Sequence, residues 1–118
     1  MVKMGSKMKI LNIRENEKKA LIELKEKLSS IFKSVKIILF GSKVRGDFDK
    51  ESDIDILILL DCPITSKIEE DVSEIAYEIE LKYGVVFGKI IENTNYWNNS
   101  RNKCTPLYQS IEKEGFQI

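Results

Sequence analysis

The chain has 118 residues, enough for one domain with a modest core, and 42% hydrophobic with 32% charged residues is typical of a globular protein. Lysine plus arginine and aspartate plus glutamate number 19 each, so the net charge is zero, and strong binding of nucleic acid through its phosphates is not expected. No apolar run approaches the ~18 residues of a membrane helix, and no apolar signal segment follows the first lysines. We therefore expect a cytoplasmic protein.

The chain contains no histidine, which excludes histidine bases, histidine triads and histidine-ligated zinc. Its two cysteines, Cys62 and Cys104, have no metal-binding or redox spacing. Free thiols are favoured over a single disulfide between them. Catalysis would have to use carboxylates, a metal, hydroxyls, lysine or arginine.

The first predicted element is a helix over residues 13–33, after a frayed segment at 1–11. Asn12 with Glu15 is typical of a helix start. Apolar residues then recur at helical spacing and should face the core. They are Leu21, Leu24, Leu28 and Ile31.

Two strands follow. Residues 35–40 are rich in β-branched side chains and too few for a helix, which predicts a buried strand. A polar segment at 47–52 is interpreted as a loop whose acids are solvated. The second strand is expected over residues 53–60 and is ended by Cys62 and Pro63.

The next helix is expected over residues 66–82, with Ser66 and Glu69 as a capping box and Gly84 as the stop. A third strand is expected at 85–91. Residues 93–102 are interpreted as a loop or a loose helical turn.

Thr105 and Pro106 indicate the cap and first residue of a short last helix. Its inward residues should be Leu107, Tyr108 and Ile111. Residues 116–118 could add an edge contact. The predicted order is αβ(loop)βαβα, a single domain with a small α/β sheet and helices packed on it.

Asp53 and Asp55 are the first candidate site. Alternate side chains of a strand share a face, so the two carboxylates point the same way, roughly 7 Å apart along the backbone. Two like charges side by side repel each other, and a divalent cation between them would remove that penalty. Mg²⁺ suits the pair, because it prefers oxygen ligands and usually takes one or two carboxylates plus substrate phosphates.

Gly41 and Ser42 are the second candidate site. They follow an apolar strand and can open a short helix whose backbone N–H groups point at an anion. Arg45 lies about one turn further on, and its guanidinium fork can grip phosphate oxygens. Alone, each residue would fit an ordinary turn or a surface ion pair. Together they predict a phosphate-binding segment beside a metal-binding pair.

These residues resemble a known signature. Gly41-Ser42, Arg45-Gly46 and Ser52-Asp53-Ile54-Asp55 are similar to the GSxxRG…SDxD pattern of the nucleotidyltransferase superfamily, which shares its core with DNA polymerase beta. The length resembles that of the minimal nucleotidyltransferase (MNT) branch. The resemblance implies a mixed rather than a parallel sheet.

The resemblance also implies roles for these residues. Asp53 and Asp55 would be catalytic and would hold Mg²⁺ or Mn²⁺. The triphosphate of an NTP, with ATP as the expected nucleotide, would bind at Gly41, Ser42, Arg45, Gly46 and Ser52. The reaction would transfer a nucleoside monophosphate to a hydroxyl.

One family feature is absent. The superfamily usually carries a third acid on strand three, which activates the acceptor, and this strand contains none. Gly88 stands near the expected position. Glu92 has the same strand parity, but we expect it to lie past the strand end, so it is a weak substitute. The missing acid puts general-base catalysis in doubt while leaving metal and nucleotide binding in place.

Several functions remain open at this point. The MNT resemblance implies an antitoxin that modifies a HEPN-domain partner. The alternative is a catalytically impaired module that binds a nucleotide or a partner. Leu57 and Leu59 share the aspartates' face, which would need cover from a tail helix or from another subunit, so a homo-oligomer is a further option. Antibiotic modification is weaker, because the chain has no second domain to hold a drug. Tyr96 and Trp97 fit core-edge packing better than base stacking.

Overall fold

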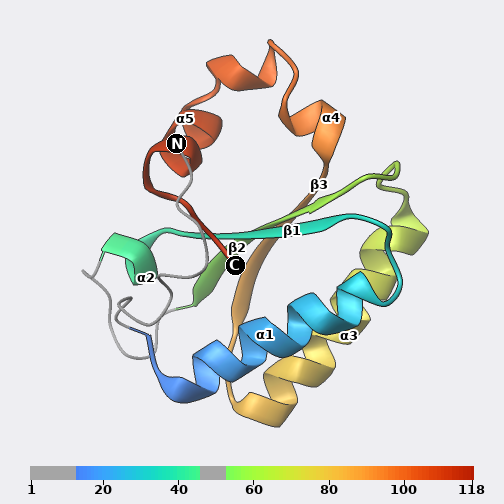
Figure 1. The fold of residues 1–118 in the computed structure, drawn as a ribbon, viewed down its shortest axis with the longest axis vertical. Coiled ribbons are helices and arrows are strands. Elements are labelled where there is room, and N and C mark those ends of the chain that lie inside the picture. The colour runs from blue at the N-terminus through green and yellow to red at the C-terminus, as the bar shows by residue number, and fades with distance from the viewer. Residues whose placement is uncertain (1–12, 46–52) are drawn as a thin grey trace.

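The computed structural model describes residues 13–45 and 53–118, which form a mixed sheet with helices on both faces (Figure 1). The strands are β1 (Val35–Phe40), β2 (Ile54–Leu60), β3 (Phe87–Asn93) and β4 (Phe116–Gln117). Their order is β3-β2-β1-β4, with β1 antiparallel to β2 and β4, and β2 parallel to β3. The expected mixed sheet is confirmed. The segment 1–11 and the loop 47–52 lie outside the described residues.

Helix α1 spans Glu15–Ser29 and begins two residues later than expected. Its N-cap is Arg14, whose backbone N–H donates to Glu17 Oε1 at 2.8 Å. The start predicted from Asn12 and Glu15 is therefore wrong, because Glu17 is the carboxylate that reaches back to the cap. Asn12 itself lies outside the described residues.

The end of α1 is set by a tight turn rather than by the apolar pattern. The Leu28 carbonyl accepts from the N–H groups of Ile31 at 3.1 Å and Phe32 at 2.9 Å, and the chain then turns into β1. Ile31 is 58% exposed, so its predicted place in the core is wrong. The rest of the stripe is buried as predicted: Leu21, Leu24 and Leu28.

Helix α3 spans Ser66–Tyr83, close to the expected range. Its cap is Thr65, whose Oγ1 accepts from the N–H group three residues on at 3.2 Å. The capping box predicted from Ser66 and Glu69 is wrong, because the side-chain oxygen one residue earlier occupies the capping position. Gly84 ends the helix with φ 67° and the left-handed conformation typical of a helix stop, as predicted.

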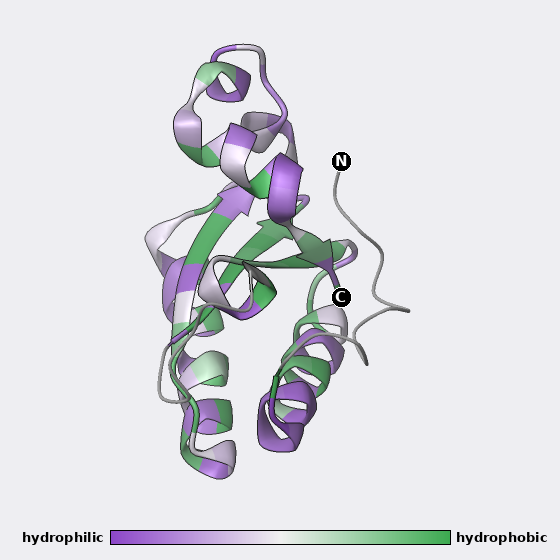
Figure 2. Cartoon of the chain, turned by 90° about the vertical axis from the view of Figure 1, so that its left-hand side faces the viewer, coloured by the Kyte–Doolittle hydropathy of each residue, from purple (hydrophilic) through white to green (hydrophobic). Residues whose placement is uncertain are grey.

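Helices α1 and α3 cover one face of the sheet with the main core. Figure 2 shows the hydrophobic strands lying between this helix pair and the tail helices. The buried side chains of this core come from both helices and from one face of the strands. Its largest fully buried members are Leu21, Leu24, Leu28, Ile37, Leu39, Ile54, Ile56, Ile58, Leu60 and Phe116.

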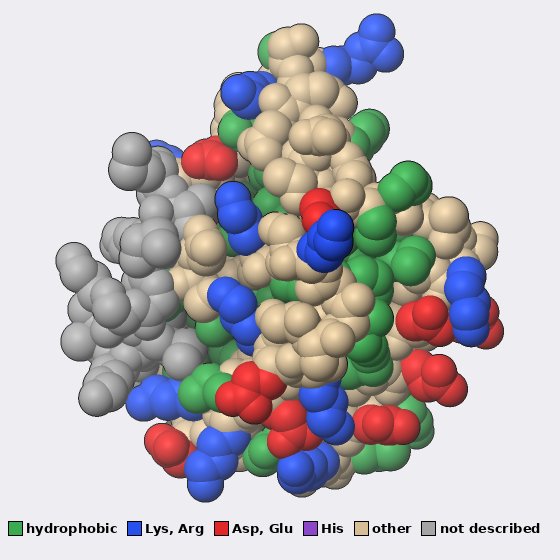
Figure 3. Space-filling model, turned by 45° about the vertical axis from the view of Figure 1, so that its right-hand side comes forward, with side chains coloured by type: hydrophobic (Ala, Val, Ile, Leu, Met, Phe, Trp, Pro, Cys, Tyr) green, Lys and Arg blue, Asp and Glu red, His purple; other side chains and the backbone are tan. Residues whose placement is uncertain are grey.

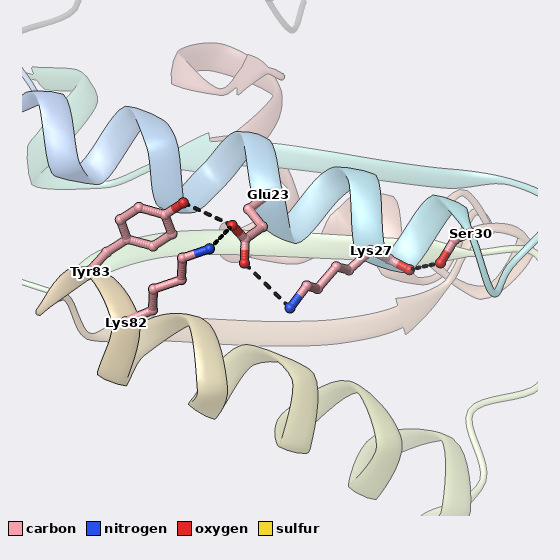
Figure 4. Close-up of polar contacts among 5 residues, drawn as sticks. All are labelled: Glu23, Lys27, Ser30, Lys82 and Tyr83. Atoms are coloured by element: carbon pink, nitrogen blue, oxygen red, sulfur yellow. Dashed lines mark hydrogen bonds and ion pairs between the residues drawn. The ribbon is translucent and has the colours of Figure 1, made fainter.

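A polar cluster joins the same two helices at their edge (Figure 4). Glu23 Oε1 on α1 accepts from Lys82 Nζ at 2.7 Å and from the Tyr83 hydroxyl at 2.8 Å, both on α3. Lys27 Nζ lies 3.3 Å from the other carboxylate oxygen. Chiefly because of Lys82, then Tyr83, the pKa of Glu23 falls to about 2.

The opposite face of the sheet is covered by the tail of the chain. Helix α4 (Thr94–Trp97) and the 3-10 turn η2 (Asn102–Cys104) lie where a loop or loose turn was expected. Helix α5 spans Pro106–Glu114 and is capped by Thr105 as predicted, since Thr105 Oγ1 accepts from the Tyr108 N–H at 3.2 Å. The last strand, β4, pairs with β1, so the expected edge contact is confirmed.

A second, smaller core lies under this tail. This core contains Leu57 and Leu59, so the tail shields the apolar part of the sheet face that also carries the aspartates. Trp97 is buried and its ring centroid lies 5.2 Å from that of Tyr108. Its other members are Ile38, Ile111, Phe40 and Ile90. The predicted inward position of Leu107 is wrong, because its side chain is 42% exposed.

Strand β3 begins two residues later than expected. Val86 is 56% exposed, and its carbonyl accepts from the Ile54 N–H at 2.9 Å. The Phe87 N–H donates to Glu80 Oε2 at 2.7 Å. The strand ends at Asn93, so the expectation that Glu92 lies past the strand end is wrong.

Positive and negative side chains are interspersed on the face shown in Figure 3. Cys62 and Cys104 are free thiols, as favoured from their spacing. Among the described residues, no helix combines the length and apolar character needed to cross a membrane.

Candidate active site

The candidate site lies at the end of the sheet where β1 stops and β2 and β3 begin. Phe40 is the last residue of β1, Gly41 makes the turn, and the short helix α2 spans Ser42–Arg45. Asp55 on β2 is paired with Phe40 on one side and with Gly88 on the other. The register therefore places Asp55 between the turn after β1 and the start of β3.

Two glycines make room for the Asp55 carboxylate. Gly41 has φ 77°, and a β-carbon on it would overlap Asp55 Oδ2. A β-carbon on Gly88 would lie 2.7 Å from Asp55 Oδ1, closer than real side chains come. The carboxylate thus lies between the turn after β1 and the start of β3.

Asp53 lies beside Asp55 on the same face of the sheet. A β-carbon on Gly88 would be 3.8 Å from Asp53 Cβ as well as close to the Asp55 carboxylate. Asp53 is exposed, whereas Asp55 is partly buried. The two acids and the Gly41 turn therefore meet at one accessible end of the sheet.

This donor set fits a hard divalent cation. Two carboxylates on one face, one of them open to solvent, match the ligands that Mg²⁺ takes together with substrate phosphates. Within residues 13–45 and 53–118, no group of three or more His, Cys, Asp or Glu side chains is arranged to hold a metal. Asp53 and Asp55 would thus share the ion with the substrate.

The structure describes some of the predicted phosphate-binding residues and not others. Ser42 is the first residue of α2 and is partly buried. The Arg45 backbone ends the same helix, but its side chain, Gly46 and Ser52 lie outside what the structure describes. Gly41, which precedes Ser42, lies against the Asp55 carboxylate, so this turn and at least one of the two acids are neighbours.

Glu114, at the end of α5, is a residue of this site that the sequence did not indicate. Its Oε1 accepts a hydrogen bond from the Gly41 N–H at 3.3 Å, although the two residues are 73 positions apart in the sequence. Nothing in the local pattern of a helix end predicts such a contact. The end of α5 thus reaches the same turn that lies against Asp55.

In the described part of the chain, no third His, Cys, Asp or Glu side chain joins the aspartate pair in a group that could hold a metal ion. Gly88 is the direct partner of Asp55, so it does stand near the expected position. Glu92 is paired with Leu59, about 13 Å further along β3 at the usual rise per residue. The pKa of Glu92 is raised, chiefly by burial and to a smaller extent by the charge of Glu69. Glu92 therefore lies too far along the strand to join the pair.

Comparisons with known proteins agree with this geometry. The family described as "Nucleotidyltransferase domain" matches residues 21–115. "Putative protein adenylyltransferase MJ0604" of Methanocaldococcus jannaschii is 42% identical over 102 residues, which are 85% of this chain and 95% of that protein. "Putative protein adenylyltransferase MJ0141" of the same organism is 42% identical over 71 residues, 58% of this chain and 72% of that protein.

The chain therefore belongs to the nucleotidyltransferase family, in its minimal (MNT) form, and is a nucleotidyltransferase.

Proposed function

We propose that this protein transfers the adenylyl group of ATP to a hydroxyl group of a partner protein. The observation that carries the proposal is the pair Asp53 and Asp55, which share one face with the Gly41 turn. The nucleotide and the class of acceptor are suggested by the two relatives, whose names describe protein adenylyltransferases.

Asp53 and Asp55 would hold Mg²⁺ or Mn²⁺, and the ion when bound would neutralise phosphate charge and help to acidify the acceptor hydroxyl. Ser42 would contact the β- and γ-phosphates through its hydroxyl and N–H groups. Gly41, Gly46 and Ser52 would complete the nucleotide site. The Arg45 guanidinium would neutralise charge that develops on the departing pyrophosphate.

The proposed reaction is an in-line displacement at the α-phosphorus. The acceptor oxygen forms a bond to phosphorus while the bond to the bridging oxygen of the β-phosphate breaks. Pyrophosphate leaves, and the hydroxyl proton is released to water at the solvent-exposed side of Asp53.

A HEPN-domain protein in the cytoplasm is the proposed partner, with this chain as the antitoxin of the pair. The test is incubation with Mg²⁺, ATP and the product of the neighbouring gene. ATP labelled at the α-phosphate should label the partner, whereas ATP labelled at the γ-phosphate should not.

Asp53→Asn should reduce label transfer on the order of 100-fold to 1,000-fold, because it removes a preorganised charge at the reacting phosphate. Asp61→Asn is the matched control, since Asp61 is an exposed aspartate just beyond the other end of β2. Equal transfer by wild type and Asp53→Asn would contradict the proposal.

The second candidate function is neutralisation of a partner by contact alone. It is favoured by Gly88, which stands near the position where a third acid is expected. In that case Asp53→Ala with Asp55→Ala would still bind and neutralise the partner. Loss of neutralisation in a complex that still forms would exclude it.

A further inference from the structure

A buried ion pair lies directly beside the Gly41 turn. Lys43 Nζ on α2 lies 2.7 Å from Glu17 Oε2 on α1, and each residue is 1% exposed. Among the described residues, these are the charged side chains that are buried. Removing two charges from water is costly, so such a pair needs a closely fixed geometry.

Glu17 is itself fixed at the start of α1. Its second oxygen, Oε1, accepts from the Arg14 backbone N–H at 2.8 Å and lies 3.7 Å from Arg14 Nε. The helix that carries Glu17 packs on the sheet through Leu21 and Leu24. The carboxylate is thus a rigid point to which Lys43 is attached.

Lys43 in turn belongs to an element that cannot hold itself in place. Helix α2 has four residues, a single turn, and so short a helix is unstable on its own. It follows Gly41, whose positive φ redirects the chain out of β1. Its orientation relative to β2 therefore depends on contacts with the rest of the fold, and the one to Glu17 is buried.

We propose that Glu17 and Lys43 are a positioning pair that sets the orientation of the Gly41–Ser42 turn relative to Asp53 and Asp55. This inference rests on the proposed function, in which that turn binds the triphosphate. A neutral pair of similar volume can replace a buried ion pair without loss of stability. What the neutral pair lacks is the fixed length and direction of the Lys43–Glu17 contact.

The test uses the double variant Glu17→Gln with Lys43→Met, which removes both charges and keeps an oxygen at Glu17 for the Arg14 N–H. The control is Glu23→Gln with Lys82→Met, which removes the α1–α3 ion pair away from the turn. The first readout is the N–H order parameter by ¹⁵N relaxation. For Ser42 to Val44 it should fall from about 0.85 to below about 0.6 in the test variant, with β1 unchanged, and stay unchanged in the control.

The second readout is the dissociation constant for Mg·ATP, which should rise at least tenfold in the test variant and less than twofold in the control. The positioning role would be overturned if the order parameters of α2 were unchanged in the test variant. It would also be overturned if they fell while the affinity for Mg·ATP stayed the same. If wild type does not bind Mg·ATP, the proposed function fails on its own, and with it the role at a nucleotide site.

Lys43→Arg covers the case in which the double variant does not fold. It keeps the charge but changes the length and shape of the contact, so the protein should fold with a Tm within a few degrees of wild type. Its affinity for Mg·ATP should fall three- to tenfold. Affinity equal to that of wild type would overturn the proposal.

Discussion

Asp55 has little freedom because its carboxylate lies between Gly41, in the turn after β1, and Gly88 on β3. Gly41 and Gly88 come so close that any side chain at either position would meet the carboxylate oxygens. Asp53, by contrast, is exposed and can adjust to a ligand. One acid of the pair is therefore preorganised, and the other is adaptable.

Gly88→Ala should reduce the affinity for Mn·ATP by about tenfold or more, because the new methyl group would lie 2.7 Å from Asp55 Oδ1 and displace the carboxylate. The same clash means that Gly88→Asp should not restore a third catalytic acid. Isothermal titration with Mn·ATP measures the affinity.

Gly84→Ala is the control for Gly88→Ala. Gly84 has φ 67° and open space around it, so alanine there should cost about 1 kcal/mol of stability and leave the affinity unchanged. If Gly88→Ala bound Mn·ATP as tightly as wild type, the enclosure of Asp55 would have no functional meaning.

At the scale of elements, α1 and α3 are joined by Glu23. The pKa of Glu23 is about 2 in the folded protein, below its ordinary value of 4.5. A depressed carboxyl pKa means that the unfolded state binds the proton more tightly. Its contribution to stability is present above about pH 4.5 and is lost as the pH falls towards 2.

Glu23→Gln should therefore lower the Tm at pH 7, and the difference from wild type should shrink as the pH falls from about 4.5 to 2. Thermal melts followed by circular dichroism across this range measure it. Glu26→Gln, on an exposed position of the same helix, serves as the control and should change stability by less than about 0.5 kcal/mol. A pH-independent difference for Glu23→Gln would contradict the assignment.

The start of α3 gives a second prediction at this scale. Thr65→Ala should cost about 1 kcal/mol, because it removes the oxygen that accepts from the third helical N–H group. Ser66→Ala, one residue later, should cost far less. Urea unfolding of the two variants compares them directly, and equal losses would show that Thr65 does not act as the cap.

At the scale of the whole molecule, the tail completes the fold by covering the aspartates' side of the sheet. Ile111→Ala should cost about 2–5 kcal/mol, since it opens a cavity above Leu57 and Leu59. Leu107→Ala, on the same helix but exposed, should change stability by less than about 0.5 kcal/mol. Chemical unfolding measures both, and similar values would contradict the packing.

Much of this architecture could be predicted from the sequence, because strong periodicity marks α1, α3 and the first two strands. The exact first residues of helices and strands were predicted wrongly where two neighbouring residues could each fill the same role. Thr65 and Ser66 can both cap a helix, and Val85 and Val86 are as apolar as the strand that follows them. Only tertiary pairing decides between such neighbours.

In the candidate site, too, local patterns predicted some residues, whereas others depend on tertiary contacts. Alternation along a strand predicted that Asp53 and Asp55 share a face, and both lie beside Gly88, although β2 begins only at Ile54. The turn at Gly41 was predicted from its position after an apolar strand. Glu17, Lys43 and Glu114 could not be found this way. Lys43 pairs with Glu17 on α1, and Glu114 at the end of α5 accepts from Gly41. No local sequence pattern records such long-range pairings.

The attachment of the tail to β1 has a consequence for how the molecule forms. Glu114 meets Gly41 across 73 positions of sequence, and β4 docks on the same strand. Contacts between such distant segments require closure of a long loop and tend to form late. The end of the sheet that carries Gly41 and Asp55 should thus form last, after the helix pair on the other face has already folded.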